Sequence, residues 1–207
     1  ATAITLLVGY PVAYAMARAP RKWQGALLMA VILPFWTSFL IRVYAWTGIL
    51  KRDGLLNLAL ENVGLISEPL TIHNTQIAVY IGIVYSYLPF MVLPLYSALE
   101  KMDHALLEAA ADLGCRPWRA FWRITAPLSL PGVAAGCFLV FIPAVGEFVI
   151  PQLLGGADTL MIGKTLWNEF FSNRDWPLAS AVAVVLLVVL VLPIMVFQRM
   201  ANRAGAG

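Results

Sequence analysis

The sequence predicts an all-α protein whose helices span a membrane. Of its 207 residues, 61% are hydrophobic and only 12% are charged, whereas about a quarter of the residues are charged in an ordinary soluble domain. The mean hydropathy is +0.80. Several apolar stretches also approach or exceed the roughly 20 residues that a helix needs to cross the hydrocarbon core of a bilayer. A soluble domain is therefore excluded, and a bundle of membrane helices is expected.

The apolar stretches predict five spans within a single domain covering residues 1–207. The first stretch is slightly short and opens inside an apolar run, so at least one further span is expected upstream of it. We find no internal repeat and no low-complexity segment. The spans are predicted at residues 1–17, 25–47, 76–99, 128–150 and 178–197.

Lysine and arginine are unevenly distributed among the segments that connect these spans. Segments 48–75 and 151–177 carry four of the 14 cations and are mildly acidic. Segments 18–24, 100–126 and 198–207 carry nine, so the positive-inside rule places them, and the C-terminus, in the cytoplasm. The acidic outer segments either attract a cation or are ordinary solvated loops. The nine cytoplasmic cations are Arg18, Arg21, Lys22, Lys101, Arg116, Arg119, Arg123, Arg199 and Arg203.

The most informative segment is Leu106–Pro127, with the sequence LLEAAADLGCRPWRAFWRITAP. Apolar residues recur at helical spacing in its first half, and Gly114 is a natural helix stop. Pro117 can begin a second helix, because the first turn of a helix does not need its missing N–H. The second helix would present arginines and aromatic rings. The segment therefore predicts a short helix, a turn and a basic, aromatic second helix.

This pair of predicted helices has two interpretations. As an interfacial pair lying on anionic lipid, it would explain Arg116, Arg119 and Arg123 but not the first helix. The small residues Ala109 and Ala110 allow close backbone approach, which suits docking into a groove of another protein.

The spacing within this segment resembles the EAA signature of permease subunits of binding-protein-dependent ABC importers. The signature is Glu-Ala-Ala, three residues, Gly, nine residues, Ile, two residues and Pro. This chain supplies it with Ala126 where Leu is usual before the proline, a conservative departure. The matching residues are Glu108, Ala109, Ala110, Gly114, Ile124 and Pro127.

The resemblance implies a type I permease fold in which this segment is the coupling helix for a cytoplasmic ATPase. The implied coupling residues are Glu108, Ala109, Ala110, Asp112, Gly114 and Arg116. It also implies a second permease subunit, two ATPase subunits and a periplasmic binding protein, in the bacterial inner membrane. ATP and Mg²⁺ would be bound by the ATPase subunits, because this chain has no P-loop motif. No catalytic residue, cofactor, metal site or nucleic-acid partner is expected in this chain.

Further stretches resemble the putrescine/spermidine branch of these permeases, and most closely its putrescine-type subunit. They lie at 33–50, 80–99, 141–156 and 168–181. The branch implies a cationic diamine or polyamine as substrate, although the sequence does not choose between putrescine and spermidine.

Glu147 is the main candidate for the transport pathway. It follows Pro143 and Gly146 and precedes Pro151, a composition that favours a broken helix. On a continuous helix from Leu128 it would lie roughly 28 Å along the axis, near the outer edge of a core about 30 Å thick. It is therefore either a pathway carboxylate, which we favour, or an interfacial one.

Arg42 and several aromatic residues complete the pathway candidates. Arg42 would either snorkel to the outer interface or pair with Glu147 in one conformation. Aromatic faces attract ammonium groups, and Tyr44 and Tyr85 are the pathway candidates among the aromatic residues in or beside the spans.

Three other functions compete with a polyamine permease. An ion-gradient-driven secondary transporter predicts internal symmetry, and a membrane scaffold would not need Glu147 and its neighbouring prolines. An ABC permease for another small solute, such as a metal or an oxyanion, stays open.

Overall fold

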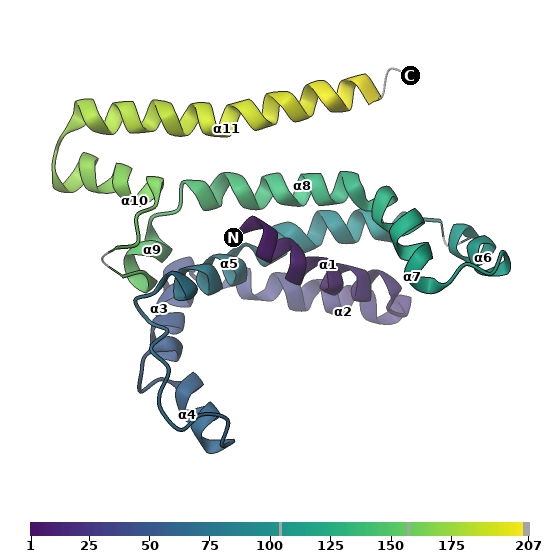
Figure 1. Ribbon diagram of the computed structural model, residues 1–207, viewed down its shortest axis with the longest axis horizontal. Helices are drawn as coiled ribbons and strands as arrows, with labels where there is room; N and C mark the ends of the chain where they lie inside the picture. The colour runs from purple at the N-terminus through teal and green to yellow at the C-terminus, as the bar shows by residue number, and fades with distance from the viewer. Residues whose placement is uncertain (104, 157, 205–207) are drawn as a thin grey trace. The chain divides into compact units, whose positions relative to one another are not determined.

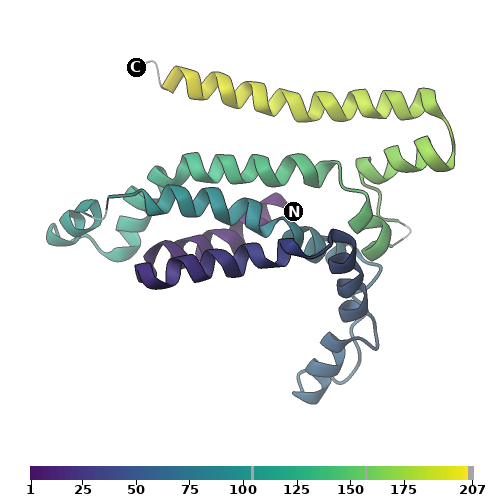
Figure 2. The same ribbon diagram turned by 180° about the vertical axis from the view of Figure 1, so that it is seen from behind.

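All regular structure among the described residues is helical, which confirms the all-α prediction. The computed structural model describes residues 1–207 except 104, 157 and 205–207, and its side chains are described as far as Met195. Figures 1 and 2 show the chain from two opposite sides. Its elements are α1 Thr2–Arg18, α2 Arg21–Ile32, the 3₁₀ turn η1 Leu33–Trp36, α3 Phe39–Leu50, α4 Leu55–Asn62, α5 Gln76–Glu100, α6 Ala105–Asp112, α7 Pro117–Ala120, the π turn η2 Phe121–Thr125, α8 Ala126–Val145, α9 Val149–Leu154, α10 Ile162–Trp167, the π turn η3 Asn168–Ser172 and α11 Trp176–Ala204.

Within the described residues, three helical stretches are long and apolar enough to cross a membrane. They are Gln76–Glu100, Pro117–Val145 and Trp176–Met195. The second joins α7, η2 and α8 without a break, so the predicted loop at 100–126 is already helical over its last ten residues. Helix α1 has 17 residues and is shorter than these spans.

The predicted span at 25–47 is interrupted. The α-helix tightens into a 3₁₀ turn at Leu33–Trp36, and Thr37 is extended, with ψ of 152°. Pro34 lies in this turn, and the Thr37 hydroxyl donates to its carbonyl oxygen at 2.7 Å. Proline has no N–H for the α-helical ladder, so the chain ends α2 here and begins α3 at Phe39. Together, Arg21–Trp36 and Phe39–Asn62 are apolar enough to form either one broken span or a re-entrant loop.

The chain forms two compact units. The first unit contains residues 1–38 and 84–141, and the second contains residues 39–83 and 142–207. Helices α5 and α8 each contribute to both units.

Glycines allow close helix packing in the first unit, where α1, α5 and α8 lie side by side (Figures 1 and 2). A Cβ added to Gly9 on α1 would lie 2.9 Å from Met91 Cγ, and one added to Gly136 on α8 would lie 2.8 Å from Met91 Sδ. At Gly132 it would lie 2.9 Å from the carbonyl oxygen of Pro94. Small residues that let backbones approach are the usual basis of helix association in lipid.

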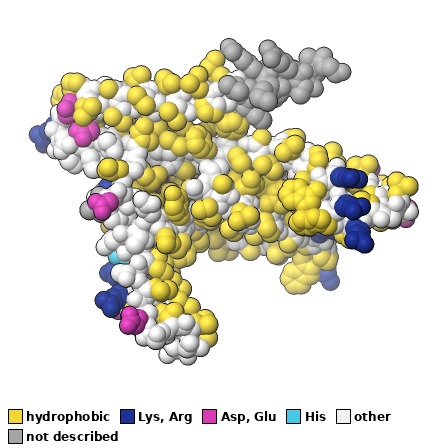
Figure 3. Space-filling view, viewed as in Figure 1, with side chains coloured by type: hydrophobic (Ala, Val, Ile, Leu, Met, Phe, Trp, Pro, Cys, Tyr) yellow, Lys and Arg dark blue, Asp and Glu magenta, His cyan; other side chains and the backbone are white. Residues whose placement is uncertain are grey.

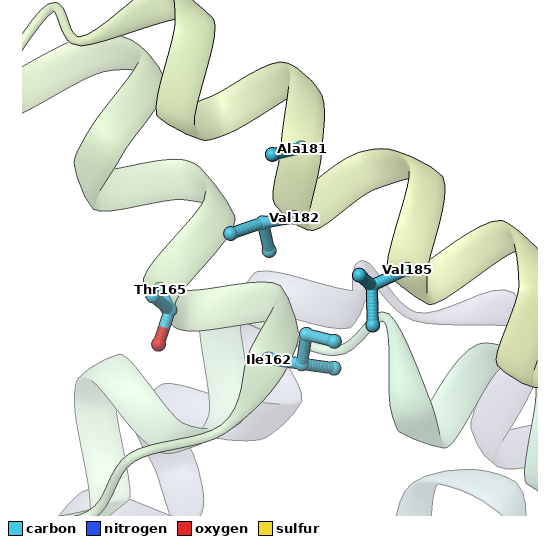
Figure 4. Close-up of a pocket in the computed structure, with 5 residues that line it drawn as sticks. All are labelled: Ile162, Thr165, Ala181, Val182 and Val185. Carbon is cyan, nitrogen blue, oxygen red and sulfur yellow. The ribbon is translucent and has the colours of Figure 1, made fainter.

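In the second unit, α9 packs against α3 and against the start of α5. A Cβ at Gly82 would lie 2.6 Å from Leu154 Cδ1, so a larger residue there would require side chains of α9 to shift. Helices α10 and α11 form a hairpin with a pocket between them (Figure 4). Its apolar lining carries no charged group that could hold a cation. The lining residues are Ile162, Thr165, Ala181, Val182 and Val185.

The predicted outer segment at 48–75 is ordered by a buried amide. Asn57 is 2% exposed, and its side chain donates to the carbonyl oxygen of Leu70 at 2.9 Å and accepts the Leu70 N–H at 3.0 Å. Farther along, the Asn74 N–H donates to the Leu154 carbonyl oxygen at 3.1 Å. A buried amide with its hydrogen bonds made holds a segment in one conformation.

Candidate coupling surface and transport pathway

Helix α6 places the coupling candidates on an exposed surface. Glu108, Ala109 and Asp112 are exposed, and Ala110 is half-buried. The helix also exposes two large apolar side chains, Leu106 at 47% and Leu113, just beyond its end, at 88%. Leu106, Ala109 and Leu113 share one helical face by their spacing. Large apolar side chains exposed side by side on a short helix suit a protein-docking surface.

A Schellman motif ends α6 at the predicted place. The Gly114 N–H donates to the Ala111 carbonyl oxygen at 2.8 Å, and the Cys115 N–H donates to that of Ala110 at 2.9 Å. Gly114 has φ of +74°, a left-handed conformation that glycine adopts without strain. The prediction of a helix stop at this glycine is confirmed.

The second helix begins at Pro117, as its sequence predicted, with Arg116 as the N-cap residue. The Arg116 carbonyl oxygen accepts the N–H groups of Arg119 and Ala120 at 2.9 and 3.0 Å. The Arg116 side chain is exposed. Arg116 therefore fixes the turn through its backbone, while its guanidinium group stays available to a partner.

Phe121 anchors this second helix to α1, a contact that sequence reasoning missed. Its ring packs edge-on against Tyr10 and Tyr14 of α1, each with centroids 5.7 Å apart. The Tyr10 hydroxyl lies 2.8 Å from Ser129 Oγ on α8. Because edge-to-face pairs add about 0.5–1.5 kcal/mol beyond burial, the coupling segment, α1 and α8 are held as one body.

Replacing Phe121 by alanine is expected to loosen the coupling segment. The variant loses both edge-to-face pairs, and truncating a fully buried phenylalanine to alanine costs about 3–5 kcal/mol. Since Phe121 is half-buried, the loss should be smaller than that. Hydrogen exchange at residues 117–125 should rise severalfold, and transport per ATP hydrolysed should fall. Phe121→Tyr should retain the ring contacts and serves as the control; equal protection in both variants would contradict the anchoring role.

Glu147 is buried at the break between α8 and α9. Its side chain is 7% exposed, and Oε1 accepts the backbone N–H groups of Val149 at 2.9 Å and Ile150 at 3.3 Å. The carboxylate therefore caps α9, where it also complements the partial positive charge of a helix N-terminus. The predicted span at 128–150 ends at Val145, so Glu147 lies beyond the helix rather than on it.

The backbone beside Glu147 is held closely by α10. A Cβ added to Gly163 would clash with the carbonyl oxygen of Gly146, and it would lie 2.8 Å from that of Glu147. Within a membrane, irregular backbone such as that beside proline and glycine is tolerated only where protein or a water-filled cavity surrounds it. The structure has such a break, and the surrounding elements position the carboxylate.

The remaining pathway candidates fall in different units. Tyr44 lies on α3, is 59% exposed and shares the second unit with Glu147. Tyr85 lies on α5 in the first unit and is half-buried. Arg42 is half-buried on α3, with its guanidinium carbon 5.9 Å from the centroid of the Phe39 ring. Helix α3, which carries Tyr44 and Arg42, packs against α9, the helix that Glu147 caps.

A ladder of aromatic rings follows Glu147 and was not predicted. Phe148 stacks on Trp167 with centroids 4.2 Å apart and an interplanar angle of 7°. Trp167 in turn lies 4.2 Å from Phe171. Because the three rings come from two distant segments, no local sequence pattern indicates the ladder.

Comparison with known proteins identifies the family. Residues 9–204 match the profile of the family described as binding-protein-dependent transport system inner membrane component. The chain belongs to this family. It is therefore the permease subunit of an ABC importer and not the ATPase, which is a separate subunit.

Relatives of this inner-membrane component include two spermidine/putrescine transport system permease proteins named PotB. The protein from Haemophilus influenzae is 49% identical over 203 residues, which cover 98% of this chain and 71% of the relative. That from Escherichia coli K12 is 46% identical over 199 residues, covering 96% and 72%. Among solved structures, a bacterial alginate ABC transporter in complex with an alginate-bound periplasmic protein matches with a TM-score of 0.70 at 19% identity, covering 98% of this chain and 75% of that chain. This likeness shows the type I permease fold.

Proposed function

We propose that this permease subunit imports a cationic diamine or polyamine, putrescine or spermidine, across the bacterial inner membrane. The observation that carries the proposal is the 49% identity, over 98% of the chain, to a spermidine/putrescine permease. Relatives this similar usually share a substrate class, whereas fold alone does not decide function. The buried carboxylate of Glu147 supports the same class, because it supplies a negative charge for an ammonium group.

The complete importer contains a second permease subunit, two ATPase subunits that bind ATP and Mg²⁺, and a periplasmic binding protein. The lysine- and arginine-rich segments and the C-terminus lie in the cytoplasm. Helix α6, with Glu108, Ala109, Ala110 and Asp112, docks on the ATPase, and Gly114 and Arg116 form the turn behind it. The outer segments at 48–75 and 151–177 meet the binding protein.

Substrate passes Glu147, with Tyr44 and Tyr85 on the pathway. Glu147 offers charge, and the tyrosines offer aromatic faces to an ammonium group. ATP-driven movement at α6 reaches this region through α8, which runs from the coupling segment to Val145.

ATP hydrolysis by the reconstituted complex tests the proposal. The binding protein is supplied empty, loaded with putrescine or loaded with spermidine. Stimulation by one loaded amine is the expected result, and it names the substrate. If an assembled complex responds to neither amine, the permease imports another small solute and the polyamine assignment falls.

A further inference from the structure

The segment α7–η2 carries a surface that the coupling role does not use. Besides Pro117, its exposed side chains are Trp118, Arg119, Trp122 and Arg123. The two tryptophans lie one turn apart with ring centroids at 5.7 Å, and the arginines follow them at the same spacing on the adjacent face. We call these four residues the Trp–Arg stripe. Buried Ala120 and Thr125 mark the opposite, protein-facing side.

The charge of the Trp–Arg stripe is uncompensated. Between Leu113 and Val145 the sequence has no carboxylate, and its only charged residues are Arg116, Arg119 and Arg123. Among the described residues, no carboxylate lies within ion-pair distance of Arg119 or Arg123. Figure 3 shows lysine and arginine side chains beside large apolar ones at the end of the first unit that carries α6 and α7. The surface therefore suits an anionic, amphipathic partner.

The depth of the stripe identifies that partner. Helix α8 has 20 residues, about 30 Å at 1.5 Å per residue, which matches the thickness of the hydrocarbon core. Arg123 and Trp122 then lie about 5–6 Å beyond the core, and Arg119 and Trp118 about 10–12 Å beyond it. The headgroup layer is roughly 5–8 Å thick on each side, so Arg123 and Trp122 lie within it and Arg119 and Trp118 lie at its aqueous edge. Helix α6 precedes α7 in the chain and carries exposed side chains, so a soluble ATPase can reach it.

We infer that the Trp–Arg stripe binds the phosphate headgroups of anionic phospholipids at this membrane surface. The arginines contact the phosphates, with Arg offering paired N–H donors, and the indoles of Trp118 and Trp122 lie at the headgroup boundary. Trp118 is 71% exposed and Trp122 is 56% exposed, so water would otherwise cover two large aromatic side chains. Phe121 of the same helix packs on Tyr10 of α1. Bound lipid would therefore stabilise this helix on its other, exposed side.

Native mass spectrometry of the complete importer tests this inference. The complex is reconstituted with equal amounts of phosphatidylglycerol and phosphatidylcholine, and the lipids that remain bound after detergent extraction are counted. Wild type should retain phosphatidylglycerol in preference to phosphatidylcholine. A cation near an anionic membrane surface contributes about 1 kcal/mol, so Arg119→Gln/Arg123→Gln should weaken this preference by about 30-fold. Lys51→Gln/Arg52→Gln removes two exposed cations from another segment and should leave the preference almost unchanged.

The outcomes separate lipid from protein partners. Arg119→Lys/Arg123→Lys should restore most of the preference, because the charge is kept. A wild-type complex without preference for phosphatidylglycerol would overturn the inference even if the glutamine variant failed to assemble. Loss of the ATPase from the glutamine variant, with its lipid preference intact, would assign the stripe to the ATPase instead. None of these readouts depends on which solute is transported.

Discussion

Replacing Glu147 by glutamine is expected to lower amine uptake at least tenfold while the importer still assembles. Glutamine keeps an oxygen that can accept the N–H groups of Val149 and Ile150, so the cap of α9 survives. Only the negative charge is lost. Hydrogen bonds to charged groups contribute about 1.5–3 kcal/mol, and about 1.4 kcal/mol corresponds to a factor of ten. The measurement is uptake of labelled putrescine and spermidine into proteoliposomes.

Two further variants separate charge from capping. Glu147→Leu removes both the charge and the cap, so it should also lower the yield of assembled complex. Glu61→Gln is the matched control, because Glu61 is an exposed carboxylate on α4 of the same unit. Uptake by Glu147→Gln at the wild-type level would remove Glu147 from the pathway and leave it a structural cap.

Replacing Gly114 by valine is expected to uncouple transport from ATP hydrolysis. The position has φ of +74°, where a residue with a Cβ is strained by about 1–2 kcal/mol and a β-branched one is an outlier. The end of α6 would rearrange, although no neighbouring atom lies within 4 Å of an added Cβ. Co-purification of the ATPase and substrate-stimulated ATP hydrolysis should both fall severalfold.

The chain supplies a closely matched control in Gly64. It also has φ of +74° and open space around an added Cβ, and it ends α4 with the same motif, in which the Leu65 N–H donates to the Leu60 carbonyl oxygen at 3.0 Å. Gly64→Val therefore introduces the same strain away from the proposed ATPase contact. Glu108→Lys, which reverses an exposed charge without backbone strain, should also weaken ATPase docking. If Gly114→Val and Gly64→Val lose the co-purifying ATPase to the same extent, the effect is general instability and the coupling assignment fails.

Local chemistry explains which features could be predicted from the sequence. The turn between α6 and α7 was predicted because Gly114 and Pro117 act on their own backbone. The break after Pro34 was not predicted, and the end of α8 at Val145 was not placed, since proline marks a disturbance but the tertiary surroundings decide where the helix ends. The family resemblance rests on the spacing of residues from Glu108 to Pro127. This spacing is visible in the sequence without knowledge of any tertiary contact.

Contacts between distant segments could not be predicted. The sequence predicts that Phe121 lies on the apolar side of an amphipathic helix. No local sequence pattern indicates that Tyr10 and Tyr14 are its partners. Glu147 was recognised as a special carboxylate, but its capping of α9 depends on where α8 ends. The buried amide of Asn57 likewise has its main partner, Leu70, 13 residues away.

The uninterrupted helix from Pro117 to Val145 has a thermodynamic consequence. Its last residue is two positions before Glu147, and Phe121 fixes its first turns to α1. If nucleotide binding by the ATPase docked on α6 alters the affinity for an amine near Glu147, then the amine must alter the affinity of the ATPase for nucleotide by the same factor, because linkage between two binding sites is reciprocal. The occupied pathway thus acts as an effector of the ATPase, and the nucleotide-binding isotherm of the importer should shift with amine concentration.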